Sequence, residues 1–291
     1  MRRKAYHSLC VKPSVVFSAD YSIREAIEAD KPKILKLVEH TWSWGDYIPS
    51  VIDSWLSQVN SKVFVCTYGD EIVGMSHLSV EEGGLGWLEG ARVALQHRNK
   101  GVATMIANDI IEYASKNGLK KLRLAVAVSN KPSIRHVEKV GFRPVTTFKR
   151  LTCETSVKTP LISTKKLGEN DSRSVLSSNV YESYAKLYYK SFRWLDLNED
   201  SLIRLAITGR AFFVNTTLLI HSSEYEDDGK RIAEIGYLQL DPTTPSLNEV
   251  ISLFALRLYS KLDLILPEGL ESPLEGFVEQ DERFIVFERQ L

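Results

Sequence analysis

The chain has 291 residues, more than one hydrophobic core usually organises, so two domains are expected. Its 37 basic and 37 acidic residues cancel, which argues against nucleic acid as a partner because no net charge attracts a polyanion. Three cysteines without paired spacing argue against a disulfide framework and a metal site, and favour a cytoplasmic location. No apolar run reaches the roughly 20 residues of a membrane span, so no membrane partner is expected.

The first half predicts a strand, a pair of helices, and then strands that alternate with helices. A polar leader over residues 1–20 precedes this pattern. We expect strands at 22–27, 62–68, 71–80, 86–93, 121–128 and 143–152, and helices from Asp30, from Pro49 to Gln58, at 100–117 and at 132–140. This order predicts an α/β domain with a mixed sheet over residues 21–156.

The second half echoes this order of elements, without a shared sequence motif. Residues 157–178 are rich in Ser, Thr, Lys, Asn and Gly and predict a connector, with the domain boundary near Leu161. In a second domain over 179–291, we expect helices at 179–190, 198–207, 246–260 and 272–278, and strands at 211–215, 217–222, 231–241, 262–266 and 283–288. The echo predicts a second domain of the same α/β class.

The segment from Gln96 to Ala103 joins a predicted strand to a predicted helix. Small residues at Gly101 and Ala103 let the backbone approach a ligand closely. The free N–H groups of a first helical turn attract an anion, and the positive end of the helix dipole adds to this attraction. A pyrophosphate fits this description.

The R-x-x-G-x-A pattern from Arg98 to Ala103 resembles the acetyl-CoA loop of the GNAT acetyltransferase superfamily. Asn130 after a buried strand, with Gly141-Phe142 eleven residues later, also resembles a segment of that family. The resemblance covers about half the chain and implies a GNAT fold, followed by a degenerate GNAT-like domain. It implies that acetyl-CoA is the acetyl donor, with its pyrophosphate on the backbone of Arg98, Asn99, Lys100, Gly101, Val102 and Ala103, and its pantetheine arm beside Val93, Asn130 and Ser133.

Two further segments, Gly45 to Pro49 and Glu89 to Val93, resemble the histidine N-acetyltransferase branch of the superfamily. That branch modifies the α-amino group of free amino acids, so the resemblance implies a small primary amine as acceptor.

An aromatic and acidic cluster lies in the segment that borders the acceptor in this superfamily. Aromatic walls with one carboxylate suit a cationic or aromatic amine, and the cluster is Trp42, Trp44, Asp46 and Tyr47. The alternative, that Trp42 and Trp55 are ordinary core residues, stays open.

The chemistry needs a base, because an amine that is protonated at neutral pH must lose a proton before it attacks a thioester. Glu89 is the candidate base, since it lies four residues before Val93 and a regular strand puts both on one face. An ion pair of Glu89 with a basic neighbour such as Arg92 is the alternative. Many members of the superfamily place a tyrosine acid where this chain has Val137, which leaves water, His136 or a tyrosine elsewhere as the proton source.

Three functions stay open at this point: acetylation of a small amine, acetylation of a protein N-terminus or lysine, and acyl-CoA sensing without turnover. The sensor hypothesis is motivated by the missing tyrosine acid at position 137, where this chain has Val137. A homodimer is also open. In the second half Pro242 and Pro245 stand where the first half has its glycine loop, and proline lacks an N–H, so we expect no cofactor there.

Overall fold

The computed structural model describes residues 21–39, 41, 45–159, 161–240, 247–270 and 276–291. The chain divides into two compact units. Unit 1 contains Met1–His77 and Gly90–Ile110, and unit 2 contains Leu78–Glu89 and Ile111–Leu291. These units alternate along the chain, whereas the domains predicted from the sequence are consecutive.

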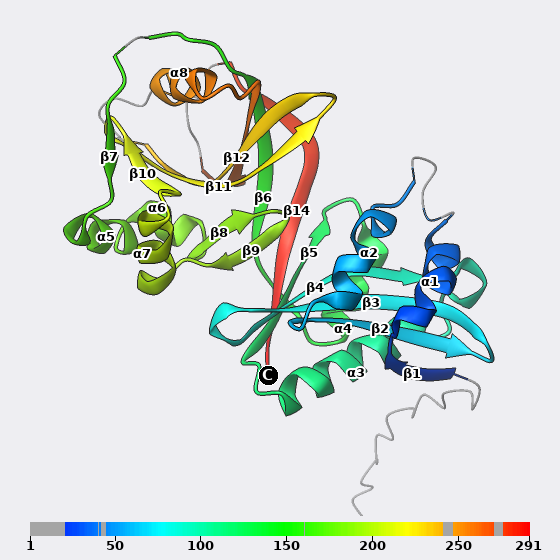
Figure 1. Ribbon diagram of the computed structural model, residues 1–291. Helices are drawn as coiled ribbons and strands as arrows, with labels where there is room; N and C mark the ends of the chain where they lie inside the picture. The colour runs from blue at the N-terminus through cyan, green and yellow to red at the C-terminus, as the bar shows by residue number, and fades with distance from the viewer. Residues whose placement is uncertain (1–20, 40, 42–44, 160, 241–246, 271–275) are drawn as a thin grey trace, which may run out of the picture. The chain divides into compact units, whose positions relative to one another are not determined.

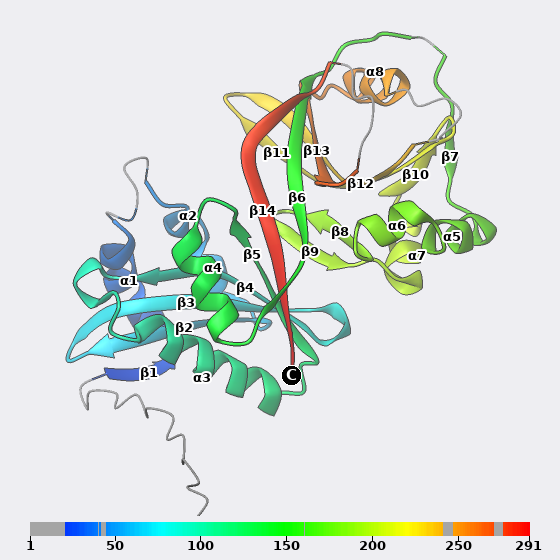
Figure 2. The same ribbon diagram turned by 180° about the vertical axis from the view of Figure 1, so that it is seen from behind.

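Unit 1 is a sheet with helices on both faces. Its strands follow the order β1-β2-β3-β4, and the two views place α1 and α2 on one face and α3 on the other (Figures 1 and 2). The bounds are β1 (Tyr21–Glu25), α1 (Lys31–Val38), α2 (Ile48–Ser57), β2 (Ser61–Tyr68), β3 (Glu71–Glu81), β4 (Leu85–Val93) and α3 (Val102–Lys116).

Local sequence explains how these elements begin and end. The Gly69-Asp70 turn joins β2 to β3, and Gly69 has a φ of 57° that favours glycine. Asp30 is the N-cap residue of α1, as expected, but its side chain bonds backward, where Oδ2 accepts from the Ile27 amide at 2.9 Å. Helices α1 and α2 each carry a proline in their first turn and bury Ile34, Val38, Ile48, Ile52 and Trp55 against the sheet.

Unit 2 contains one long sheet and a separate hairpin. The order of the long sheet is β4-β5-β14-β6-β13-β12-β11-β10-β7, and β8 pairs with β9. The bounds are β5 (Lys121–Ala127), α4 (Lys131–Lys139), β6 (Arg143–Glu154), β7 (Thr164–Lys166), α5 (Glu169–Leu176), α6 (Asn179–Ser183), β8 (Leu187–Lys190), β9 (Arg193–Asp196), α7 (Glu199–Ile207), β10 (Ala211–Val214), β11 (Thr217–Asp227), β12 (Lys230–Gln239), α8 (Asn248–Leu256), β13 (Lys261–Pro267) and β14 (Val278–Gln290).

The two halves of the chain exchange strands in the middle of this sheet. β14 lies between β5 and β6 and is antiparallel to both. β6 in turn lies between β14 and β13. The long β6 and β14 run side by side in both views (Figures 1 and 2). Each half therefore receives one strand from the other half to complete its part of the sheet.

The secondary structure differs from the sequence prediction in three places. The helix predicted over 179–190 ends at Ser183, and the β8–β9 hairpin follows it. Its turn uses Ser191 and Phe192, both with positive φ, which carry no common turn signal. The stretch expected as a connector contains β7 and α5. The helix predicted over 272–278 lies mostly outside the described residues, and Val278 begins β14.

The mixed α/β fold predicted from the sequence is confirmed, because β4 pairs with β5 in parallel and the neighbouring strands are antiparallel. Among the described residues, no helix is long and apolar enough to cross a membrane.

Candidate active site

The loop between β4 and α3 presents a row of backbone amides at the start of a helix. Asn99 and Gly101 have φ values of 61° and 84°, which turn the chain into the start of α3 at Val102. Within the part of the chain that the structure describes, the amides from Asn99 to Thr104 make no backbone hydrogen bond of good geometry, and the next, Met105 N–H, reaches the Gly101 carbonyl at 3.0 Å. Such amides, at the positive end of a helix dipole, form an anion site.

The loop is fixed at both ends by contacts within unit 1. The Ala94 amide donates to the Val73 carbonyl at 2.9 Å, and the buried His97 ring lies 2.8 Å from the Tyr21 hydroxyl through Nδ1. A Cβ on Gly74 would lie 2.7 Å from Val102 Cγ1, so glycine at this position lets α3 approach β3 closely. The start of α3 is therefore held in place while Arg98, Asn99 and Lys100 remain exposed.

Asp46, predicted to contact the acceptor, is held by Arg92. Arg92 Nε donates to Asp46 Oδ2 at 2.8 Å and its NH2 to Oδ1 at 3.1 Å, and the Asp46 side chain is 1% exposed. Burial alone would raise the pKa of Asp46, but the Arg92 and Ile48 hydrogen bonds outweigh it and lower that pKa. Tyr47 lies beneath the guanidinium, with 5.6 Å between its ring centre and Arg92 Cζ. Arg92 is thus paired with Asp46.

Trp55 links this cluster to the sheet. Its ring stacks on His77 at 4.0 Å between centroids, and the Ser61 hydroxyl donates to the Trp55 carbonyl at 2.7 Å while it also contacts His77 Nε2. A Cβ on Gly90 would lie 2.8 Å from the Trp55 ring, and Gly90 has a φ of 67°. β4 is therefore irregular at Gly90, and the alternation expected to put Glu89 and Val93 on one face is interrupted there.

Glu89, the predicted base, is paired with an arginine from the second half of the chain. Arg193 on β9 donates from NH2 to Glu89 Oε1 at 2.8 Å and from NH1 to Glu81 Oε1 at 2.7 Å. Ser79 donates to the same Glu81 oxygen at 2.8 Å. The Glu89 carboxylate is 15% exposed, so it is largely buried but still reachable. Arg193 is a residue that the sequence reasoning missed, because no local pattern joins two strands so far apart in the chain.

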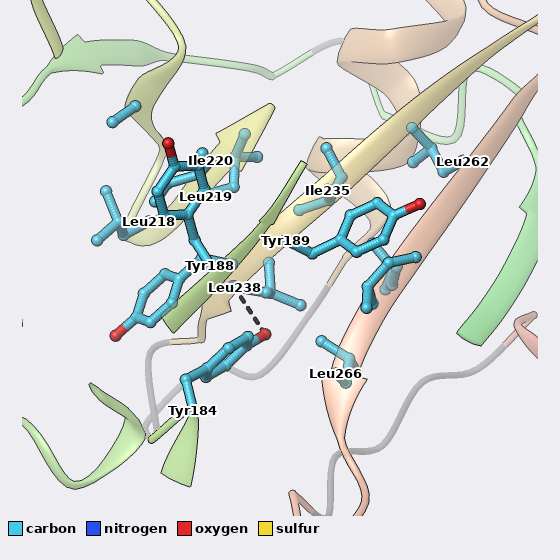
Figure 3. Close-up of a cluster of buried hydrophobic side chains, with 14 of the residues drawn as sticks. Tyr184, Tyr188, Tyr189, Leu218, Leu219, Ile220, Ile235, Leu238, Leu262 and Leu266 are labelled. Carbon is cyan, nitrogen blue, oxygen red and sulfur yellow. Dashed lines mark hydrogen bonds between the residues drawn. The ribbon is translucent and has the colours of Figure 1, made fainter. Parts of the chain in front are cut away.

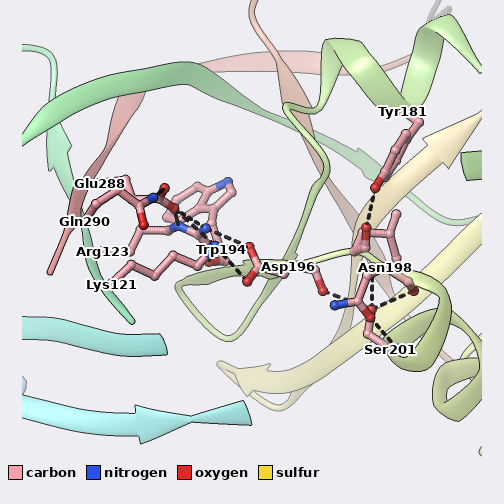
Figure 4. Close-up of polar contacts among 10 residues, drawn as sticks. Lys121, Arg123, Tyr181, Trp194, Asp196, Asn198, Ser201, Glu288 and Gln290 are labelled. Atoms are coloured by element: carbon pink, nitrogen blue, oxygen red, sulfur yellow. Dashed lines mark hydrogen bonds and ion pairs between the residues drawn. The ribbon is translucent and has the colours of Figure 1, made fainter. Parts of the chain in front are cut away.

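Arg123 fixes the strand that carries Arg193. The Arg123 side chain is 1% exposed, and NH1 donates to the Trp194 carbonyl at 2.8 Å (Figure 4). Its NH2 binds Asp196 at 2.7 Å, and its guanidinium also pairs with Glu288 on β14. β5, β9 and β14 therefore meet at one buried cation whose hydrogen-bonding groups are paired.

Asn130 and Ser133 lie at the start of α4 in unit 2. Asn130 Oδ1 accepts from the Ser133 amide at 3.2 Å and caps the helix. Val137, which replaces the tyrosine of the resemblance, is buried. Burial, and then the charge of Lys139, lower the pKa of His136, so this ring is mainly neutral near pH 7. Trp42 and Trp44 lie outside the described residues.

The second half contains a comparable pair of parallel strands, and its own residues cover them. β12 pairs with β13 in parallel over Ile232–Ile235, as β4 pairs with β5 over Leu85–Trp87. Beyond this stretch, a Cβ on Gly236 would lie 1.9 Å from the Tyr189 carbonyl oxygen of β8. The Leu238 amide donates to the Tyr184 hydroxyl at 3.0 Å, within a cluster of buried leucine and tyrosine side chains (Figure 3).

Residues 23–142 match the family model described as "Acetyltransferase (GNAT) family". A histidine N-acetyltransferase of Scomber australasicus is 30% identical over 95 residues, which cover 32% of this chain and 28% of that protein. The uncharacterised N-acetyltransferase YobR of Bacillus subtilis (strain 168) is 32% identical over 85 residues, or 29% of this chain and 34% of that protein. The match thus spans about a third or less of these curated relatives.

Two solved structures resemble nearly the whole chain. A putative acetyltransferase from Thermoplasma acidophilum has a TM-score of 0.61 at 15% identity, and covers 93% of this chain and 100% of that one. A GCN5-related N-acetyltransferase from Sphaerobacter thermophilus has a TM-score of 0.59 at 13% identity, and covers 94% of this chain and 97% of that one. At such identities the likeness shows the fold alone, and the fold includes both halves.

Proposed function

We propose, from the match of residues 23–142 to the GNAT acetyltransferase family, that this chain is an enzyme of that family and acetylates the primary amine of a small molecule. Enzymes of this family use acetyl-CoA as the acetyl donor. An amino acid is the acceptor class that we favour.

The row of amides from Asn99 to Thr104, which make no well-formed backbone hydrogen bond among the described residues, carries this proposal. A pyrophosphate needs several hydrogen-bond donors in one place, and the turn at Gly101 supplies them without a side chain in the way. The exposed cations of Arg98 and Lys100 add charge attraction at the same place. The residues present therefore fit the phosphate end of acetyl-CoA.

Acetyl-CoA supplies the thioester carbonyl that the acceptor amine attacks. In our proposal Glu89 takes a proton from the acceptor ammonium, directly or through a water molecule. The free amine then forms the C–N bond as the C–S bond breaks, its nitrogen releases a second proton to water, and the thiolate takes a proton from water. Because His136 is mainly neutral, water is the proton source that we favour, and a thiolate leaves readily without a tyrosine acid at Val137.

The remaining site residues have narrower proposed roles. Asp46 is paired with Arg92, so its proposed role is to hold that guanidinium against Tyr47. Tyr47 is 40% exposed, and its ring is the proposed contact for an acceptor. Val93, Asn130 and Ser133 stay the proposed neighbours of the pantetheine arm, and Trp42 and Trp44 stay predicted acceptor contacts.

A small acceptor is favoured over a protein by the likeness to a histidine N-acetyltransferase, which covers part of each chain. We propose that the second half is a GNAT-like domain that binds no CoA. Two contacts support this. The Leu238 amide donates to the Tyr184 hydroxyl, and the Tyr189 backbone packs against Gly236, so the strand that a ligand would need is already covered.

The deciding experiment measures CoA release from acetyl-CoA in the presence of free amino acids, polyamines or peptides, together with CoA binding by calorimetry. Turnover with free amino acids supports the proposal. Turnover with peptides alone would favour a protein acetyltransferase, and CoA binding without turnover would favour the sensor.

A glycine variant tests the amide row directly. Gly101→Ala places a Cβ on a residue with a φ of 84°, in the row of amides, and should weaken CoA binding by about tenfold or more. Gly69→Ala is the matched control, because Gly69 also has positive φ and its Cβ would meet open space in a hairpin turn. Equal CoA affinity in both variants would contradict the assigned site.

A further inference from the structure

The guanidinium of Arg193 is shared between two carboxylates. NH2 lies 2.8 Å from Glu89 and NH1 lies 2.7 Å from Glu81, so one cation compensates two negative charges. Glu81 is itself fixed, since Ser79 donates to the same oxygen. The group nevertheless meets solvent, because the Arg193 side chain is 28% exposed.

Arg193 belongs to a rigid element, so its position is determined. The residues that follow it, Trp194 and Asp196, bind the buried Arg123 through a backbone carbonyl and a carboxylate (Figure 4). Trp194 is 1% exposed and packs in the core of unit 2. The β8–β9 hairpin thus presents Arg193 at a fixed point beside Glu89.

We infer that Arg193 is a positioning residue for Glu89. Arg193 holds the Glu89 carboxylate in its ionised form and in a fixed orientation, and Glu81 weakens this effect because it binds the same guanidinium. This inference rests on the proposed function. It gives the second half of the chain a part in the reaction, through the β8–β9 hairpin.

The charges around this carboxylate support the inference. A cation within hydrogen-bonding distance favours the ionised form of a carboxylate, which is the form that accepts a proton. Glu81 opposes this effect, because it draws part of the same positive charge. Tyr188 on the same hairpin stays neutral, because burial, and then the charge of Glu82, raise its pKa to about 12. Arg204 and Glu82 form an ion pair at the surface, so their opposite charges neutralise each other.

The test compares pH profiles of kcat for Arg193→Gln and Glu81→Gln with that of the unchanged protein. Without Arg193 the acidic limb of the profile should move to higher pH by roughly one unit or more, because protonation of Glu89 becomes easier. Without Glu81 it should move to lower pH. Arg193→Lys should restore part of the loss, and the KM for acetyl-CoA should stay the same in all variants.

Arg204→Gln is the matched control, because it removes a surface arginine that forms an ion pair with Glu82, the residue next to Glu81. Its pH profile should not move. Far-UV circular dichroism and the thermal midpoint of each variant show whether the fold is intact. An equal loss of kcat at every pH in Arg193→Gln would overturn the inference, because it indicates a structural role alone.

A second measurement separates this inference from the proposed function. Carbon-13 NMR of labelled glutamate side chains follows the ionisation of Glu89, assigned by its absence in Glu89→Gln. A higher titration midpoint in Arg193→Gln, and a lower one in Glu81→Gln, support the inference. An unchanged midpoint overturns it. If the NMR shifts appear but no amine is ever acetylated, the proposed reaction fails while the control of Glu89 by Arg193 stands.

Discussion

The stability of unit 2 should depend on pH through His221 on β11. Its side chain is 6% exposed and lies edge-on to Phe254 and Tyr259, with ring centres 5.1 and 5.5 Å away. Within the described residues its Nε2 has no hydrogen-bond partner. Burial first, and then the charge of Arg210, lower the pKa of His221 to about 4. The ring is therefore neutral in the folded state at physiological pH.

The sign of the effect follows from proton binding. The ordinary pKa of 6.5 applies when the chain is unfolded, so between pH 6.5 and about 4 the unfolded chain binds the proton that the folded chain refuses. The stability contribution is therefore fully present above pH 6.5 and is lost as pH falls. At 1.36 kcal/mol per unit, the whole loss is about 3 kcal/mol, of which about 2 kcal/mol falls between pH 7 and pH 5.

Urea denaturation of the full chain and of His221→Gln at pH 7, 6 and 5 measures this effect. Glutamine is close to histidine in size and does not titrate, so the variant should lose about 2 kcal/mol less than the unchanged protein from pH 7 to pH 5. The other histidines are the same in both proteins and cancel in the comparison. If both proteins lose stability in parallel, His221 takes up its proton in the folded state and the reasoning is refuted.

Two further predictions concern packing and strand exchange. Gly236→Ala should cost about 1–3 kcal/mol in urea denaturation, because its Cβ would overlap the Tyr189 carbonyl, whereas Gly269→Ala, with nothing within 4 Å, should change stability by less than about 0.5 kcal/mol. Equal effects of the two substitutions would contradict the close packing of β8 on β12. A chain that ends after residue 156 should show no cooperative unfolding by circular dichroism, because β14 is missing between β5 and β6. A cooperative transition in that fragment would show that the first half folds alone.

Most elements of the first half were predictable because their signals are local. The Gly69-Asp70 turn, the proline at the start of α2 and the glycine before α3 each determine one turn or helix end. The proposed phosphate loop, Arg98 to Ala103, rests on the same kind of signal, since its expected chemistry comes from its own backbone. For this reason the spacing of Arg98 to Ala103 could be interpreted without a structure.

The pairing of distant segments could not be predicted. An ion pair of Glu89 with a basic group was foreseen as an alternative, but Arg193, which pairs with Glu89, lies more than 100 positions later in the chain and could not be named from the sequence. The position of β14 between β5 and β6 depends on long-range hydrogen bonds that leave no periodic trace in either segment. Each half also resembles a complete domain in its order of elements, which hides the exchange.

The strand exchange has a consequence for biosynthesis. A ribosome makes Lys121–Glu154 long before it makes Val278–Gln290, so β5 and β6 emerge without the strand that joins them. Domains usually fold in order as they leave the ribosome, but here the sheet of the first half is complete only after β14 has been made. Until then, two strand edges with free N–H and C=O groups are open to other chains. We therefore expect slow translation of the segment that encodes Val278–Gln290, or the loss of a chaperone, to reduce the soluble yield of this protein more than that of a chain whose domains fold in sequence.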